Sequence, residues 1–153
     1  MSTDLFSAMR YEAPFLIEWI AYHKVIGFDR IVIVSNDCTD QTATLLDRLA
    51  AAGEITHVPQ TVPENGSPQK GAIRIFQGGD FLADGDWAIY LDADEFLNIK
   101  LGDGQVSDLI GYLSKNDQVG MLINWKIFGD SGQTHFTGRH ISEDYPRCDS
   151  GLE

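Results

Sequence analysis

The chain has 153 residues, of which 43% are hydrophobic and 10% aromatic, and its formal net charge at pH 7 is −12. This length and composition are typical of one globular domain with a single core. The negative charge argues against binding to nucleic acid or to an anionic membrane, because either partner would be repelled.

The sequence also bears on the compartment. No apolar run approaches the roughly 20 residues that cross a bilayer, so we expect no transmembrane segment. The first four residues lack the basic start and apolar core of a secretory signal. Cys38 and Cys148 are far apart and without metal-ligand spacing, which indicates reduced thiols. We therefore expect a cytoplasmic protein.

The first third of the chain alternates strand, helix and strand. Leu5 to Met9 is a weak strand candidate, and Pro14 then suits the first turn of a helix that ends near Gly27. Ile31–Val34 is β-branched without polar alternation, as in a strand covered on both faces. The helix carries its apolar stripe at helical spacing, with a packed histidine in it: Phe15, Leu16, Trp19, Ile20, His23 and Ile26.

Further β–α steps follow. Thr39 or Asp40 can cap a helix that closes at Gly53, and residues 54–58 read as a short strand. Residues 59–66 form a loop by composition. Ser67 and Pro68 then supply an N-cap and a proline start for a helix that runs to about Gln77.

The last predicted elements are a strand at Trp87–Leu91, a helix at 106–113 and a strand at Val119–Ile123. Strands that alternate with helices predict an α/β fold with a mostly parallel sheet and helices on both faces. We expect Ile31–Val34 and Trp87–Leu91 to be neighbouring central strands, since both lack polar alternation.

The strand at Trp87–Leu91 ends in the acidic run Asp92-Ala93-Asp94-Glu95. In an open α/β sheet, ligands bind at the carboxyl ends of the strands. Two acids spaced i, i+2 can both reach one hard cation while Ala93 points away. Such a cation usually serves a phosphate. The motif alone leaves a strand followed by a solvated acidic turn as an alternative.

Taken together, three segments resemble the family-2-like glycosyltransferases. They are Arg10–Trp19 (R-Y-E-A-P-F-L-I-E-W), Ser35–Thr42 (S-N-D-C-T-D-Q-T) and Asp92–Phe96 (D-A-D-E-F). The resemblance implies a GT-A-like, Rossmann-like fold and a nucleotide-diphosphate sugar as donor. It also implies Mn2+ or Mg2+ held by Asp92 and Asp94, and transfer to a hydroxyl of a saccharide or surface polymer.

The same resemblance suggests which residues hold the nucleotide. Its candidates are Glu12, Asn36, Asp37 and Asp92, with Lys70 and Arg74, spaced i, i+4, placed to neutralise the diphosphate. Several of these residues have a structural alternative. Glu12 is also typical of a helix start, and Lys70 and Arg74 of a solvated helix face. Asp40, a further polar residue of the second segment, is equally typical of a helix cap. Ser35 and Asn36 stand where related proteins commonly carry an acid, so the preferred base stays open. His135 is a candidate third metal ligand.

The end of the chain is poor in pattern. We expect a nucleotide-sugar-binding domain at 1–123 and a partial acceptor-side segment or mobile tail at 124–153, with Leu152-Glu153 as a vector-derived end. Glu143 and Asp144 are the only late acids with a claim to act as general base, so no catalytic residue is assigned.

The short region after Asp94 suggests a truncated donor half that is weak or inactive by itself. Two other readings stay open. One is a non-catalytic nucleotide- or partner-binding module, and the other is a phosphatase of the haloacid-dehalogenase type, which would use the first Asp of a D-x-D as nucleophile.

Overall fold

The computed structural model describes residues 1–148. The chain divides into two compact units, Met1–Gly111 and Tyr112–Glu153. Leu152-Glu153, interpreted above as a vector-derived end, lies outside the described residues. Each unit is described by itself below.

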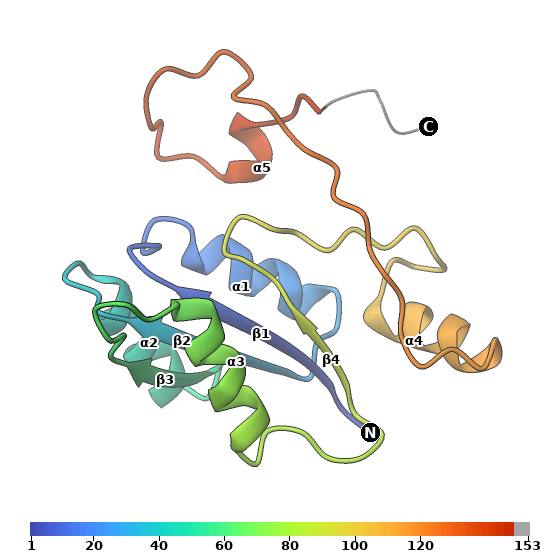
Figure 1. Cartoon of the computed structure of the whole chain (residues 1–153). Coiled ribbons are helices and arrows are strands. Elements are labelled where there is room, and N and C mark those ends of the chain that lie inside the picture. The colour runs from blue at the N-terminus through green and yellow to red at the C-terminus, as the bar shows by residue number, and fades with distance from the viewer. Residues whose placement is uncertain (149–153) are drawn as a thin grey trace. The chain divides into compact units, whose positions relative to one another are not determined.

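The first unit is built on a parallel sheet of four strands (Figure 1). The strands are β1 (Thr3–Met9), β2 (Arg30–Asn36), β3 (Thr56–Gln60) and β4 (Trp87–Tyr90). Their order across the sheet is β3-β2-β1-β4, and every pairing is parallel. The α/β fold class and the parallel sheet are therefore confirmed.

The prediction that Ile31–Val34 and Trp87–Leu91 are neighbouring central strands is wrong. β4 pairs with β1, with Leu5 opposite Ile89 and Phe6 opposite Tyr90, and within the described residues it stands at one edge of the sheet. β1 occupies the centre that was expected for β4. β1 contains one charged residue, Asp4, whose side chain is fully buried. The guanidinium of Arg30 donates to both carboxylate oxygens of Asp4 at 2.9 Å.

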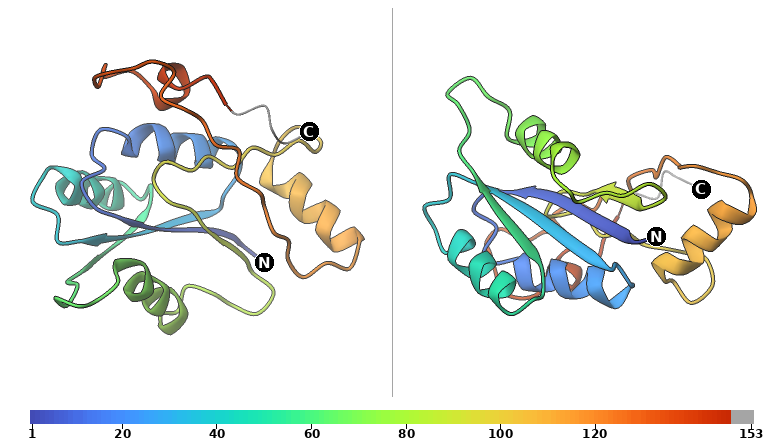
Figure 2. Two further views of the ribbon diagram at one scale, coloured as in Figure 1. Left: turned by 45° about the horizontal axis from the view of Figure 1, so that its top comes forward. Right: turned by 90° about the horizontal axis from the view of Figure 1, so that it is seen from below.

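Helices cover both faces of this sheet (Figure 2). On one face α1 (Leu16–Val25) and α2 (Thr42–Ala51) enclose the larger core cluster, which includes Trp19 from α1 and Leu46 from α2. On the other face α3 (Pro68–Gly78) packs against Phe6, Val32 and Val34 through Ala72 and Phe76. The expectation of helices on both faces is confirmed.

The start of α3 agrees with the sequence prediction. Ser67 is its N-cap, and the Ser67 hydroxyl accepts a hydrogen bond from the backbone N–H of Lys70 at 3.3 Å. The side-chain amide of Gln60 donates to the carbonyl of Pro68 at 3.0 Å. This bond joins the end of β3 to the first turn of α3.

The predicted helix at 106–113 is present as α4 (Val106–Lys115), which spans the boundary between the two units. Val106 belongs to the larger core cluster, and its N–H donates to the carbonyl of Ile26 at 2.8 Å. No helix in residues 1–148 is both long enough and apolar enough to cross a membrane.

The second unit has little regular structure. It contains the short helix α5 (Ile141–Asp144) and an isolated antiparallel bridge between Phe128 and Cys148. The predicted strand at Val119–Ile123 is wrong, since these residues pair with no strand and Val119 and Leu122 are 99% and 95% exposed. Strand propensity depends on packing against a partner, and the described chain supplies none here.

Candidate functional site

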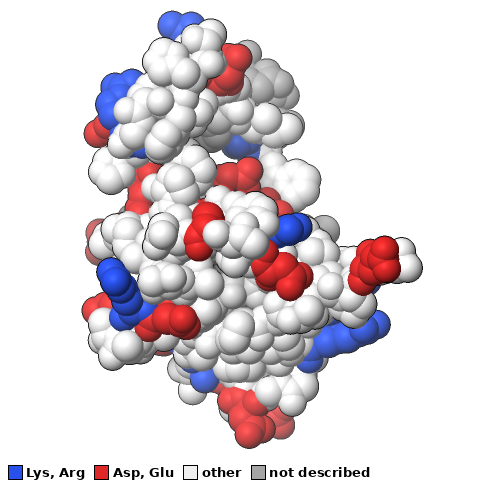
Figure 3. Space-filling view, turned by 90° about the vertical axis from the view of Figure 1, so that its left-hand side faces the viewer, with Lys and Arg blue, Asp and Glu red and all other residues white. Residues whose placement is uncertain are grey.

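The loops that follow β1, β2 and β4 meet at the carboxyl edge of the sheet. β1 leads to Arg10–Glu12, β2 to Asp37–Asp40 and β4 to Asp92–Glu95. Figure 3 faces this edge and shows more acidic than basic side chains across it. The edge therefore carries a negative field, as the net charge of the chain suggests.

The pKa of Glu12 reflects how close the acids of the three loops lie to one another. Partial burial raises the pKa of its carboxyl first, and the negative charges of Asp94, Asp40 and Asp92 raise it further. One acid after β1 thus senses an acid from the β2 loop and two from the β4 loop. Like charges brought together in this way disfavour the ionised state unless a cation balances them.

The two aspartates of the D-x-D run point outward. Asp92 and Asp94 are exposed, whereas Ala93 between them is 9% exposed and packs into the core. Glu95 turns back on its own loop, where its carboxylate accepts a hydrogen bond from the N–H of Asp92 at 3.0 Å. Glu95 therefore closes the turn, and Asp92 and Asp94 have their carboxylates at the surface.

These residues fit a hard divalent cation in their chemistry, because ionised carboxylates are acceptors only and the charge around Glu12 is unbalanced. Within residues 1–148, no three His, Cys, Asp or Glu side chains form a group that could hold a metal ion. A cation at this edge would therefore take one or two protein carboxylates and complete its shell with water and ligand oxygens, which is the usual pattern for Mg2+ at phosphates.

Three side chains of α1 hold the backbone of the acidic loop. The indole N–H of Trp19 donates to the carbonyls of Asp92 at 3.1 Å and Glu95 at 2.9 Å. The hydroxyl of Tyr22 donates to the carbonyl of Leu97 at 3.0 Å. The N–H of Leu97 donates to Nε2 of His23 at 3.4 Å. The loop is thus fixed by α1 as well as by its own strand.

His23 was predicted to be a packed histidine, and it is fully buried. Its Nδ1 lies 2.8 Å from the carbonyl oxygen of Trp19, which only accepts, so Nδ1 carries the proton and Nε2 accepts from Leu97. Burial lowers the pKa of His23 to about 4, against the raising effect of the bond to Trp19. The ring is therefore neutral at pH 7.

The predicted nucleotide residues after β2 have structural partners. Asn36 ends β2 and is 3% exposed. Asp37 has a positive φ of 46°, and its carboxylate accepts from the N–H of Val62 at 3.1 Å, which joins the β2 and β3 loops. Asp40 accepts from the N–H of Thr42 at 3.1 Å and from its hydroxyl at 2.8 Å. The predicted cap at Thr39 or Asp40 is wrong, since the N-cap of α2 is Gln41, and Asp40 bonds to the first helical residue from one position earlier.

The two basic candidates lie on α3. Lys70 is in its first turn and Arg74 one turn later, and both side chains are exposed. The Gln60–Pro68 bond keeps the start of α3 at the carboxyl end of β3. Lys70 therefore lies at the carboxyl end of β3, on the face of the sheet opposite to α1, and the strand order separates β3 from β4 by two strands.

Tyr11 was not singled out by the sequence, yet its conformation is unusual. Its φ is +64°, a left-handed value that few residues other than glycine and asparagine adopt easily. The Tyr11 hydroxyl accepts from Arg10 at 3.1 Å, whose guanidinium lies 4.7 Å from the ring centroid, and from Thr39 at 3.4 Å. These two bonds lower the pKa of Tyr11.

Replacing Tyr11 is expected to relieve backbone strain. Tyr11→Asn should raise the free energy of unfolding by about 1 kcal/mol, because Asn occupies the left-handed region at lower cost and the lost hydrogen bonds are exposed. Urea denaturation measures the change. Tyr11→Phe is the matched control, since it loses the hydroxyl but keeps the strain. A Tyr11→Asn variant no more stable than Tyr11→Phe would contradict this account.

A serine, a histidine and an aspartate are linked across β2, β3 and α2. The ring of His57 lies with Nε2 2.8 Å from the hydroxyl of Ser35 and with Nδ1 2.8 Å from the carboxylate of Asp47. The order of partners is that of a hydrolase triad. Ser35 is only 3% exposed, however, so the arrangement ties the two strands to α2 and offers no accessible nucleophile.

The phenol oxygen of Tyr90 is buried, and it interacts with the side chain of Asp92 and the backbone of Ala8. Burial raises the pKa of Tyr90 to about 12, and the nearby charge of Asp92 adds to the effect. Tyr90 is therefore a neutral donor next to the first acid of the D-x-D run.

The candidate general bases and the candidate third metal ligand, Glu143, Asp144 and His135, lie in the second unit. Glu143 is exposed, whereas Asp144 is 4% exposed and is bonded to the hydroxyl of Thr137 and to the guanidinium of Arg139. Asp144 thus has a structural role within its own unit. His135 is exposed and lies beside Thr134, with its Nδ1 3.3 Å from the hydroxyl.

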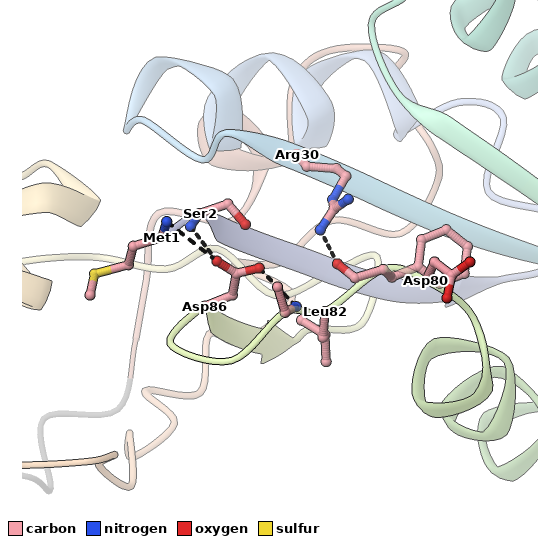
Figure 4. A pocket seen from close by; sticks show the side chains of 8 residues that line it. Met1, Ser2, Arg30, Asp80, Leu82 and Asp86 are labelled. Atoms are coloured by element: carbon pink, nitrogen blue, oxygen red, sulfur yellow. Dashed lines mark hydrogen bonds and ion pairs between the residues drawn. The ribbon is translucent and has the colours of Figure 1, made fainter.

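A separate hollow of about 540 Å³ opens at the opposite edge of the sheet (Figure 4). Residues at the amino ends of β1, β2 and β4 line it, among them Ser2, Arg30 and Asp86. The N–H groups of Ser2 and Ala83 donate to Asp86 at 2.6 and 3.0 Å and lower the pKa of Asp86 to about 2. These bonds close the amino ends of the strands and are distant from the acidic loops.

Comparison with known proteins gives two kinds of match, although no protein-family model matches the chain. A glycosyltransferase family 92 protein of Oryza sativa subsp. japonica is 26% identical over 141 residues, which cover 90% of this chain and 23% of that protein. Another glycosyltransferase family 92 protein, of Ricinus communis, is 24% identical over 139 residues, with coverages of 90% and 24%. The chain therefore spans about a quarter of the length of these curated relatives.

Solved structures give the second kind of match. The crystal structure of S. aureus TarS superposes with a TM-score of 0.53 at 14% identity, covering 84% of this chain and 24% of that one. TarS 1-349 in complex with UDP superposes with a TM-score of 0.52, covering 84% and 39%. These matches establish a shared fold. The two sequence relatives are named for family 92, and the family-2-like grouping stays a prediction.

Proposed function

We propose that the first unit is the nucleotide-sugar-binding part of a glycosyltransferase that depends on Mn2+ or Mg2+. Asp92 and Asp94 are assigned to the cation and to the diphosphate it carries. Glu12, Asn36 and Asp37 are assigned to the nucleoside side of the same edge, and Lys70 and Arg74 to the phosphates. The acceptor is a hydroxyl of a saccharide or surface polymer.

One observation carries the proposal: at the carboxyl edge of a parallel sheet, acids of the β2 and β4 loops converge on Glu12 of the β1 loop, whose pKa is raised by burial and then by their charges. This edge is where open α/β sheets bind their ligands. The names of the two sequence relatives and the UDP bound to TarS 1-349 support the same choice of ligand.

The chemistry follows from charge. A diphosphate approaching Glu12, Asp92 and Asp94 meets like charges, so a cation held by the aspartates would supply the positive charge that its binding requires. When bound, the cation also stabilises the negative charge that develops on the diphosphate as the glycosidic bond breaks. The protein contributes the two exposed carboxylates on a fixed loop and the exposed cations at the start of α3.

A nucleotide-binding module without turnover is the second candidate. It is favoured by the structure around the late acids, because Asp144 is buried and bonded to Thr137 and Arg139. Transfer or hydrolysis of a nucleotide sugar by residues 1–153 separates the candidates. A rate of about 1 per second or more would show that a general base is present.

Calorimetry of nucleoside diphosphates tests the shared part of both candidates. UDP, GDP and CDP are titrated into the protein with Mn2+ and again with EDTA. We expect at least one of them to bind clearly more tightly with the cation. Equal affinity under the two conditions for all three nucleotides would leave Asp92 and Asp94 as a solvated turn and would remove the chemical basis of the proposal.

A further inference from the structure

The loop that carries Asp92 and Asp94 has an anchor of a particular kind. The single indole hydrogen of Trp19 is shared by the carbonyls of Asp92 and Glu95, at 3.1 and 2.9 Å. These two carbonyls lie on either side of Ala93 and Asp94. One donor therefore fixes the backbone both before and after the second acid of the D-x-D run.

The anchor is rigid because it is buried and fully engaged. Trp19 is 0% exposed, and its carbonyl accepts from Nδ1 of His23 at 2.8 Å. The rings of Trp19 and His23 are 4.5 Å apart, and the ring of His23 stacks on Phe96 at 5.9 Å. An indole N–H has no alternative role, since it is a donor only and here it is away from water.

We infer that Trp19 is a positioning residue for the cation and diphosphate site, acting through the carbonyls of Asp92 and Glu95. The inference rests on the proposed function. Groups that bind a cation must be held close to their productive geometry by neighbours that are themselves fixed. Asp92 and Asp94 are exposed, and the Glu95 carboxylate accepts from the N–H of Asp92 within the loop itself, so the fixed neighbour of this segment is the indole.

The test removes the indole N–H and nothing else. Site-specific replacement of Trp19 by benzothienylalanine puts sulfur in place of the N–H in a side chain of nearly the same shape. Trp19→Phe is the genetic counterpart, although it also removes one ring of a fully buried side chain, so the analogue decides where the two differ. The matched control is Tyr22→Phe, which removes the neighbouring bond from α1 to Leu97, a residue beyond the acidic run.

The first readout is the factor by which Mn2+ strengthens the binding of the nucleoside diphosphate, measured by calorimetry against EDTA. Loss of the indole N–H should reduce this factor about three- to ten-fold, as expected for one hydrogen bond, with the affinity in EDTA unchanged. Tyr22→Phe should keep it. A factor unchanged in the Trp19 variants, an equal loss with EDTA, or an equal loss in Tyr22→Phe would each overturn the inference.

The second readout needs no ligand. Amide hydrogen exchange of residues 92–97 should become faster when the indole N–H is removed, while exchange in β1 and β2 stays slow. Unchanged exchange at 92–97 would overturn the inference. The proposed function fails separately, if the unmutated protein shows no effect of Mn2+ on nucleotide binding while the exchange result still identifies Trp19 as the anchor of the loop.

Discussion

Asp94→Asn is expected to abolish most of the coupling between Mn2+ and a bound nucleoside diphosphate. The substitution removes a charged ligand from the exposed side of the acidic loop and leaves the backbone bonds of Asp92 and Glu95 to Trp19 intact. A coupling of about 1–3 kcal/mol, or roughly 5- to 150-fold in affinity, should largely vanish. The fold should persist, because Asp94 lies outside the core. Calorimetry with Mn2+ and with EDTA measures both affinities.

Asp84→Asn is the matched control for net charge. Asp84 is exposed in the loop before β4, at the other end of the strand from the acidic run. It changes the charge of the chain by the same amount, so it should leave the coupling unchanged. If both variants lowered the coupling equally, the effect would come from the general field of the protein and Asp94 would lose its assignment.

The stability of the protein is expected to fall between about pH 6.5 and pH 4 because of His23. The folded pKa is about 4 and the ordinary value 6.5, so in this range the unfolded chain binds a proton that the folded chain does not. The free energy of unfolding should therefore decrease as the pH falls, by up to about 3 kcal/mol in all, and this contribution should level off below pH 4.

Urea denaturation at several pH values measures the slope of the free energy of unfolding against pH, and variants show whether His23 causes it. Carboxylates also titrate here, so the comparison is between His23→Gln and the unmutated protein. His23→Gln should show the shallower slope by about 1 kcal/mol per pH unit. His135→Gln removes an exposed histidine and should keep the full slope. Identical slopes in all three proteins would contradict the assignment to His23.

The sequence predicted the individual strands better than the order in which they pair. Ile31–Val34 and Trp87–Leu91 were both predicted correctly as strands, because β-branched and aromatic residues favour strands. The burial expected from their apolar runs holds for β2, whereas β4 at the sheet edge is only partly buried. The same runs do not indicate that β1 lies between these two strands. β1 was only a weak strand candidate, and the structure extends it to the buried Asp4, whose partner Arg30 is 26 residues away in the sequence and is brought to it only by folding.

The candidate site shows the same division. The position of Asp92 and Asp94 at the carboxyl edge of the sheet could be predicted, because they directly follow an apolar strand and ligands bind at that edge. Their assignment to a cation is a proposal. The anchoring by Trp19, Tyr22 and His23 was missed, although a signal was present. These residues are spaced i, i+3, i+4 on the apolar stripe of one helix, and each has a polar tip that must find a partner when buried. Tyr11 gave no comparable signal, because a left-handed φ at a tyrosine follows from the surrounding loops.

The anchoring by α1 has a consequence for how the chain acquires its site during synthesis. Trp19 and Asp92 are 73 residues apart, and Tyr22 and Leu97 are 75 apart. Contacts of such separation form late, after the entropy of a long loop has been lost. The acidic run therefore gains its geometry only when the chain is complete to about residue 97 and α1 is already docked. A fragment that starts after α1 would carry the letters D-A-D-E without the arrangement that they have here.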